Sequence, residues 1–226
     1  MVTMRRLFIS DIHGRVDALQ RLLAAVRYAP QEDRLILLGD YVGAQGENVS
    51  CLRTIQGLCA GGHATALLGN HDLALCDRLG QGFGQSRPLP AVFSYVGELA
   101  AEIGRDHPDL EAFLCGLPLW YEDETFIAVH AGFNPDLADW RTSTREEFTT
   151  IREPFLSRLP RDPRTVIFGH TPCQRLHGFA GTYFGAGKVG IDGGAGHGQQ
   201  LNCLVFDGQR LTAHAVPVRH GADPGA

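Results

Sequence analysis

Residues 7–14, LFISDIHG, decide the fold, because a short apolar run passes directly into a turn that carries an acid and a histidine. The same change recurs four more times, at residues 35–40 (LILLGD), 66–71 (ALLGNH), 126–130 (FIAVH) and 166–170 (VIFGH). Runs this short and this apolar are typical of strands buried on both faces of a sheet. Between the first two runs, residues 17–27 have apolar side chains at helical spacing, so a strand–helix–strand unit with a parallel sheet is expected.

The rest of the chain indicates a second layer and an insertion. Residues 188–192, 201–207 and 211–218 are predicted as successive strands of an antiparallel second sheet, because Gly-rich or Asp-Gly turns separate them. Residues 82–120 combine four prolines with a helical stretch at 96–103, which predicts a small helical cap. We therefore predict an α/β fold, a four-layer α-β-β-α sandwich of two mixed sheets. One domain is expected over residues 1–219, followed by a flexible tail at 220–226.

Composition excludes several classes of function. The net charge of -5 and the lack of a Lys/Arg cluster argue against stable nucleic-acid binding. The first residues predict a strand rather than a signal peptide or membrane span. The cysteines are scattered without a C-x-x-C pair, so reduced thiols and a cytoplasmic location are expected; they are Cys51, Cys59, Cys76, Cys115, Cys173 and Cys203.

All five strand ends carry side chains that bind metals, and strand ends are where α/β folds place their chemistry. Carboxylate, imidazole and amide ligands together suit borderline divalent metals such as manganese, iron or zinc. A lone histidine is more often structural, but five such strand ends in series favour a metal site. The side chains are Asp11, His13, Asp40, Asn70, His71, His130 and His170.

These motifs resemble, in order, the five signature blocks of the calcineurin-like metallophosphoesterase superfamily. The blocks are SDIHG (10–14), GDYV (39–42), GNHD (69–72), VHAG (129–132) and GHTP (169–172). The later blocks, with TIREPFL at 150–156 and IDGGA at 191–195, resemble the phosphoprotein phosphatase branch. That branch includes bacterial serine/threonine phosphatases and symmetrical diadenosine tetraphosphatases.

The resemblance implies two divalent metal ions, with manganese the expected ion in vitro. Asp40 would bridge the two ions. Water between two such ions is deprotonated at neutral pH and can attack phosphorus in line. The implied ligands are Asp11 and His13 for the first ion, and Asn70, His130 and His170 for the second.

The resemblance also assigns catalytic roles. His71 is expected to protonate the leaving oxygen, since histidine holds an available proton near pH 7. Arg152 is expected to hold the phosphoryl oxygens, because a guanidinium matches two of them at once.

The chain departs from the family pattern at two places. Gly43-Ala44-Gln45 replaces an Asp-Arg-Gly whose Asp orients the catalytic histidine and whose Arg is a second phosphate clamp. Asp72, or alternatively Glu47, is expected to orient His71 instead. GDYVG also resembles the small bacterial phosphodiesterases, but Pro172 stands where they have a further histidine ligand.

We therefore expect a hydrolase acting on phosphomonoesters, phosphoproteins or dinucleoside polyphosphates. A phosphodiesterase acting on cyclic or nucleotide diesters is the alternative, and a metal-binding regulatory protein without catalysis is the third. The expected partner is a phosphorylated small molecule, nucleotide or phosphoprotein. His197 could approach substrate, and Asp192 is expected to support the site indirectly. Core packing, or alternatively a base-stacking cap, is expected for Phe83, Phe93, Tyr95, Trp120 and Trp140.

Overall fold

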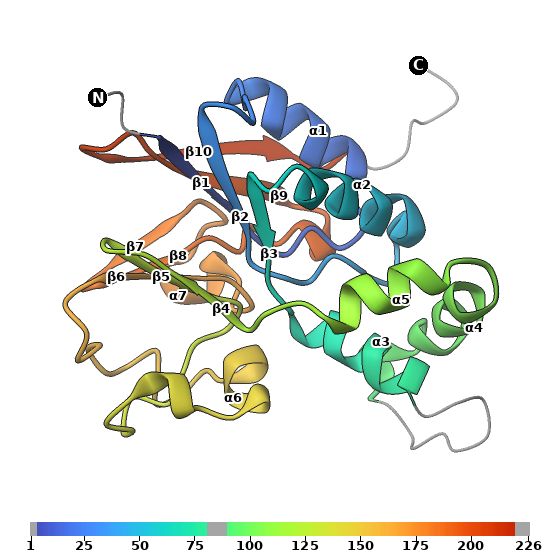
Figure 1. Ribbon diagram of the computed structural model, residues 1–226. Coiled ribbons are helices and arrows are strands. Elements are labelled where there is room, and N and C mark those ends of the chain that lie inside the picture. The colour runs from blue at the N-terminus through green and yellow to red at the C-terminus, as the bar shows by residue number, and fades with distance from the viewer. Residues whose placement is uncertain (1–3, 81–89, 220–226) are drawn as a thin grey trace.

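The computed structural model describes residues 4–80 and 90–219, and two five-stranded sheets form its centre (Figure 1). The first sheet has the order β10-β9-β1-β2-β3. Its strands β1, β2 and β3 are parallel, while β9 is antiparallel to both β1 and β10. The strands are β1 (Arg5–Ile9), β2 (Asp33–Leu37), β3 (Ala64–Ala66), β9 (Gln200–Phe206) and β10 (Leu211–Pro217).

The second sheet has the order β4-β5-β6-β8-β7, with β5, β6 and β8 parallel and an antiparallel strand at each edge. Its strands are β4 (Trp120–Glu122), β5 (Phe126–Val129), β6 (Thr165–Phe168), β7 (Tyr183–Gly185) and β8 (Lys188–Gly190). The expectation that the last three segments form an antiparallel second sheet was wrong. Of these, β8 extends the second sheet in parallel, while β9 and β10 cover the free edge of β1 in the first.

Apolar side chains fill the space between the sheets. Phe8, Ile36 and Leu204 of the first sheet and Phe126 and Ile167 of the second belong to one buried cluster. Helices α1 (Val16–Ala25) and α2 (Asn48–Ala60) cover the outer face of the first sheet, with Leu19, Leu22 and Ile55 in its core. The second sheet's outer face packs against α6 (Arg145–Thr150) and the 3-10 helix η2 (Trp140–Thr142). The predicted sandwich of two mixed sheets is confirmed.

Helix α3 (Asn70–Gly80) begins within the third signature block. The predicted insertion follows it, and residues 82–89 lie outside the described residues. Its described part forms the 3-10 helix η1 (Ala91–Phe93), α4 (Val96–Asp106) and α5 (Pro108–Cys115), which together we call the cap. The cap packs beside α3 at one end of the sandwich (Figure 1). The predicted tail at 220–226 also lies outside the described residues.

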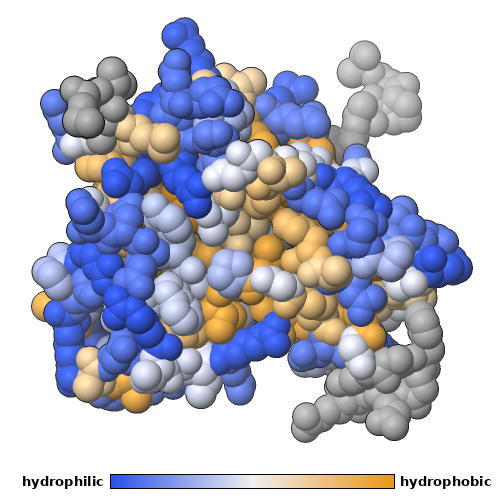
Figure 2. All heavy atoms as spheres, in the orientation of Figure 1, coloured by the Kyte–Doolittle hydropathy of each residue, from blue (hydrophilic) through white to orange (hydrophobic). Residues whose placement is uncertain are grey.

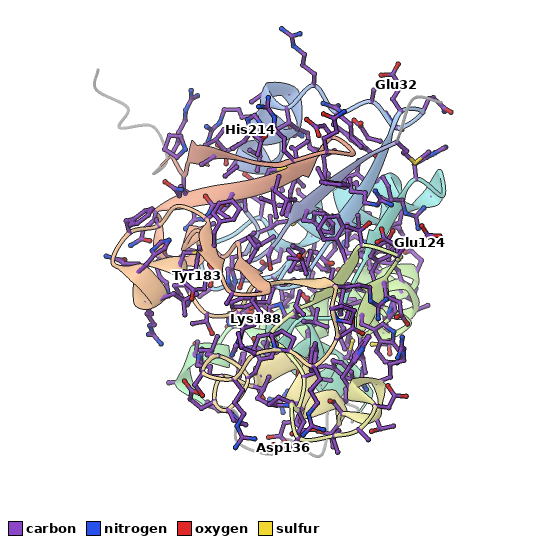
Figure 3. The ribbon with its side chains drawn as sticks, turned by 90° about the vertical axis from the view of Figure 1, so that its left-hand side faces the viewer. Glu32, Glu124, Asp136, Tyr183, Lys188 and His214 are labelled. Atoms are coloured by element: carbon purple, nitrogen blue, oxygen red, sulfur yellow. The ribbon has the colours of Figure 1, made fainter. Side chains whose placement is uncertain are left out.

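The loop after α6 is held by a buried lysine on β8. The ammonium of Lys188, labelled in Figure 3, donates to the carbonyls of Phe155, Leu156 and Arg158 at 2.5, 3.0 and 2.7 Å. It also lies 4.8 Å from the centre of the Phe155 ring. This anchor holds the loop that carries Arg152.

The surface seen in Figure 2 is mostly hydrophilic, with apolar side chains gathered toward its centre. Among the described residues, no helix has the length and apolar character needed to cross a membrane.

Candidate active site

The turns that follow the parallel strands of both sheets meet and bond to one another. The amide of Asp11 donates to the Gly39 carbonyl at 3.0 Å, and the amide of His13 donates to the Asp40 carbonyl at 2.9 Å. The amide of His170, from the second sheet, donates to the Asp11 carboxylate at 3.0 Å. These bonds bring the turns that carry the predicted metal ligands to one edge of the sandwich.

The backbone of these turns is unusual. Asp11, His13, Asp40 and His170 have φ angles of 56°, 49°, 57° and 60°, and Arg27 is the one further non-glycine residue with positive φ in the described chain. Non-glycine residues in this region are strained and cluster at functional sites. Four of the predicted ligands therefore occupy conformations that the surrounding structure must enforce.

Asp40 stands at the centre of two groups of possible metal ligands. One group is His13, Asp40 and His71, and the other is Asp40, His130 and His170. The Asp40 carboxylate lies 3.7 Å from His13 Nε2 and 3.5 Å from His130 Nε2. Asn70 joins the second group, since its Oδ1 lies 3.1 Å from His130 Nε2 and 2.8 Å from His170 Nδ1. A carboxylate shared by two groups fits the bridging role expected for Asp40.

The proton positions of the histidines test whether these groups fit metal ions. His13 and His130 each direct Nδ1 at a backbone carbonyl, of Val42 at 3.0 Å and of Leu38 at 2.8 Å. A neutral ring that donates from Nδ1 has its lone pair on Nε2. Both lone pairs therefore face carboxylate or amide oxygens that are also acceptors. Converging lone pairs repel one another unless a cation lies among them, so the donor set fits divalent metals.

Burial favours the neutral form of two of the predicted ligands, His13 and His170. Burial lowers the pKa of His13 in spite of nearby Asp40. Burial, with His130 beside it, lowers the pKa of His170 to about 3. Burial opposes ionisation of Asp40, but positive charge around it, on His130 first, holds its pKa well below its usual range, so a cation at this position favours the carboxylate form. Neutral imidazoles around an ionised carboxylate are the protonation states that metal binding requires.

Asp11 is surrounded by two other buried carboxylates, those of Asp192 and Asp40. Burial, followed by the charges of Asp192 and Asp40, raises the pKa of Asp11 well above its usual range. The Asp192 carboxylate accepts from the Gly194 amide at 2.8 Å, and Asp192 lines the same pocket. Buried carboxylates that repel one another favour a cation, so this side of the site also fits a metal ion.

His71 lies beside the shared carboxylate. Its amide donates to Asp40 Oδ1 at 2.9 Å, and its Nε2 lies 4.0 Å from Asp40 Oδ2. Its Nδ1 lies 2.8 Å from the Tyr95 hydroxyl. Burial lowers the pKa of His71, with Asp40 opposing this effect.

Asp72 does not orient His71, which corrects the expectation from the sequence. The Asp72 carboxylate is fully buried and accepts from the amides of Asp40, Tyr41 and Gly69, at 2.7, 3.0 and 3.0 Å. It holds the second and third signature turns together, and its oxygens are used for that purpose. Within the described chain, the hydrogen-bond partner of His71 Nδ1 is Tyr95.

A pocket of about 610 Å³ opens over this cluster. Ligand pockets typically measure roughly 300–1,000 Å³. Arg152 lines it as expected, but so do Arg15 and Arg175, which the sequence analysis did not identify. His197 and the cap residue Val92 also line it. Arg15 is the residue before α1, and Arg175 lies in α7 (Cys173–His177). Neither arginine belongs to a signature block, so the motifs did not predict them.

The aromatic residues considered from the sequence divide into two sets. Trp120 and Trp140 pack with Phe148 on the outer face of the second sheet, as the core interpretation expects. Phe93 instead meets the His71 ring edge-on at 4.8 Å between ring centres, next to the Tyr95 contact. Phe83 lies outside the described residues.

Comparison with known proteins gives consistent results. A family described as calcineurin-like phosphoesterase matches residues 4–194. The symmetrical bis(5'-nucleosyl)-tetraphosphatase of Glaesserella parasuis serovar 5 is 34% identical over 175 residues, which is 74% of this chain and 58% of that protein. The enzyme of the same name from Methylococcus capsulatus is 38% identical over 128 residues, covering 56% of this chain and 42% of its own. The chain thus spans about two fifths to three fifths of these relatives.

Solved structures have the same arrangement. The crystal structure of a candidate diadenosine tetraphosphatase superposes with a TM-score of 0.77 at 27% identity, covering 97% of this chain and 96% of that one. A serine/threonine phosphatase from Saccharomyces cerevisiae, similar to human PP5, superposes with a TM-score of 0.64 at 12% identity, covering 99% and 82%. The second likeness concerns the fold alone.

Proposed function

The chain belongs to the calcineurin-like phosphoesterase family, and from this premise we propose that it hydrolyses dinucleoside polyphosphates with two bound divalent metal ions. Cleavage is symmetrical, so that a dinucleoside tetraphosphate and one water become two nucleoside diphosphates. The relatives named symmetrical bis(5'-nucleosyl)-tetraphosphatases support this choice among the possible phosphoesters.

The observation that carries the proposal is the set of three arginines around the pocket, Arg15, Arg152 and Arg175. Arg15 Nε is buried and has no hydrogen-bond partner in the described structure, and its guanidinium reaches only Gln45 Oε1, at 3.4 Å. A buried donor left unpaired in a pocket is costly unless a ligand accepts from it. Three guanidiniums fit a chain of several phosphates better than a single phosphate.

Arg15 also lies close to the position of the missing second phosphate clamp, which is Ala44 in this chain. It bonds to Gln45, the neighbour of Ala44, where the family pattern has its arginine. The Arg15 guanidinium therefore lies near the position where the family pattern places its arginine, although Arg15 precedes α1 and does not belong to the 43–45 loop. This position supports binding of phosphoryl oxygens in place of the missing side chain.

The expected metal ligands form two sets, one for each ion, and the two sets share the Asp40 carboxylate. Asp11 and His13 would hold one ion, Asn70, His130 and His170 the other, and Asp40 both. When bound, the ions would supply Lewis-acid activation of water and neutralise charge on the phosphoryl oxygens. His71 would give its Nε2 proton to the leaving phosphate oxygen, because Nε2 faces the cluster while Nδ1 is occupied. Arg152 and Arg15 would orient the phosphates.

The test is product analysis with manganese-loaded protein and diadenosine tetraphosphate in ¹⁸O-labelled water. We expect ADP as the single nucleotide product, with one labelled oxygen in the terminal phosphate of half of the molecules. A phosphopeptide, a nitrophenyl monoester and a cyclic diester serve as competing substrates. AMP with ATP as products, or faster turnover of a competing substrate, would contradict the proposal.

A further inference from the structure

The His71 ring has a hydrogen-bond partner in the cap segment, just before α4. In the family pattern the group that orients this histidine is an aspartate at the position of Gly43, which has no side chain to offer. The Tyr95 hydroxyl lies 2.8 Å from His71 Nδ1, at normal hydrogen-bonding distance. We propose that Tyr95 is the positioning residue of His71 and replaces that aspartate. This inference rests on the proposed role of His71 as the acid.

Packing makes the contact specific. Tyr95 directly precedes α4, whose residues Val96 and Leu99 are buried in the core. The Tyr95 ring itself packs against this core, so the position of the hydroxyl follows from the seating of α4. Phe93 meets the His71 ring edge-on from the same segment, at 4.8 Å. The cap thus contacts His71 with two aromatic rings, one fixing its plane and one bonding Nδ1.

His71 is held from its other sides as well. The His13 ring meets the His71 ring edge-on, at 4.8 Å between ring centres. The backbone amide of His71 donates to the Asp40 carboxylate. These contacts use neither ring nitrogen, so Nδ1 and Nε2 are both left to form hydrogen bonds. Because Tyr95 occupies Nδ1, the ring nitrogen left to donate a proton to the leaving oxygen is Nε2, which lies 4.0 Å from Asp40 Oδ2.

A hydroxyl does this differently from a carboxylate. Burial, followed by the charges of Asp40 and Asp72, raises the pKa of Tyr95 above its usual range, so the hydroxyl stays neutral. A neutral hydroxyl can donate to Nδ1 of a neutral ring, which places the ring proton on Nε2, or accept from Nδ1 of a protonated ring, which carries a proton on both nitrogens. No proton passes through Tyr95, so it positions the acid and does not itself touch the reacting atoms.

Tyr95→Phe removes only the hydroxyl and keeps the ring that packs on the core. We expect kcat for diadenosine tetraphosphate to fall about 2- to 10-fold, the usual value of one hydrogen bond, with KM unchanged. The loss should shrink for a nitrophenyl ester, whose leaving oxygen needs little protonation. Tyr121→Phe is the matched control, because the Tyr121 hydroxyl bonds Asp123 at 3.1 Å away from the pocket, and it should leave kcat unchanged.

A double-mutant cycle separates positioning from packing. In a His71→Asn background, Tyr95→Phe should cause no further loss of kcat, because no acid remains to be positioned. The same fold-loss in both backgrounds would show that Tyr95 acts only through packing, and would overturn the inference.

A spectroscopic measurement on the metal-free protein tests the contact independently of activity. The ¹⁵N signal of His71 Nδ1, assigned by its disappearance in His71→Asn, should shift in Tyr95→Phe and stay in place in Tyr121→Phe. An unshifted signal would overturn the inference even if the enzyme proves active on dinucleoside polyphosphates. A shifted signal in a protein inactive on every substrate would uphold the contact and contradict the proposed function instead.

Discussion

The two ends of the active site are built in different ways. At the metal end, turns at the carboxyl ends of strands in both sheets bond to each other: the Asp11 amide donates to the Gly39 carbonyl, and the His170 amide donates to the Asp11 carboxylate. At the substrate end, Arg15, Arg152 and Tyr95 arrive from a helix start, an anchored loop and the cap. The metal end therefore depends on the sheets and permits little change. The substrate end depends on side chains that different segments can supply.

The largest effect should follow a change at the metal end. Asp40→Asn should reduce turnover on the order of 10⁴-fold and lower the metal content of the purified protein from two ions per chain, because an amide cannot replace a charge shared by two cations. Metal analysis with activity on diadenosine tetraphosphate checks both. Asp33→Asn is the control, since Asp33 is equally buried but bonds Arg5 at 2.7 Å outside the site, and it should lower stability alone. Two ions retained in Asp40→Asn would mean that Asp40 is not the bridge.

The next effect should come from His71, where the two ends meet. His71→Asn should lower kcat roughly 10²- to 10³-fold with metal content unchanged, because it removes the acid and no ligand. The loss should be smaller for nitrophenyl esters than for nucleotide substrates. His214→Asn, an exposed histidine on β10 labelled in Figure 3, is the control and should change neither quantity. Equal losses for good and poor leaving groups would show that His71 is not the acid.

Changes among the arginines should be milder, because three of them share the substrate. Arg152→Ala, Arg15→Ala and Arg175→Ala should each lower kcat/KM about 10- to 100-fold, the usual range for a hydrogen bond to a charged group. The loss for Arg15 should be greater with a tetraphosphate than with a monoester. Arg158→Ala is the control, since it pairs with Asp136 outside the pocket. A loss confined to Arg152 would leave it as the single clamp.

The same division explains what could be predicted from the sequence. The strand ends and their metal-capable residues were predicted because apolar runs and signature turns are local, and parallel strands bring their ends to one edge. Asp72, by contrast, was assigned to His71 from closeness in sequence, although at the start of a helix its carboxylate instead receives three backbone amides. Arg15 directly follows the first signature block, so its place in the sequence already puts it next to the metal ligands.

Tyr95 and the sheet assignment of β9 and β10 depended on contacts between distant segments. Tyr95 meets His71 only because α4 packs on α3, and no spacing in the sequence encodes that contact. Likewise, turn signals predicted β9 and β10 as strands, but their sheet was decided by the free edge of β1. Pairing across long separations is what pattern reasoning lacks.

The smallest effect should appear at Gly43, where the substrate end touches a metal ligand. A Cβ at this position would lie 2.8 Å from His13 Cβ, closer than real Cβ atoms come, and 3.2 Å from His13 Cα, which is a tight contact. The backbone also passes close to the His13 ring at Gly196, where an added Cβ would lie 2.7 Å from His13 Cδ2. Two hydrogen bonds from Asn48 oppose a shift of the loop: its Oδ1 accepts from the Gly43 amide at 2.8 Å, and its Nδ2 donates to the Gly43 carbonyl at 3.0 Å.

Gly43→Ala should therefore displace His13 and weaken the first metal ion about 10-fold, the effect typical of disturbing a ligand's support, while the second ion stays in place. Metal titration followed by calorimetry measures this directly. Gly57→Ala is the matched control, because a Cβ there meets nothing within 4 Å, and in the middle of α2 it should leave metal affinity unchanged and raise stability slightly. By the same reasoning, restoring the family aspartate at position 43 should impair the enzyme, since its Cβ meets the same clash. A Gly43→Asp variant with full metal content and higher turnover would show that the loop can move, and that Tyr95 and an aspartate can share His71.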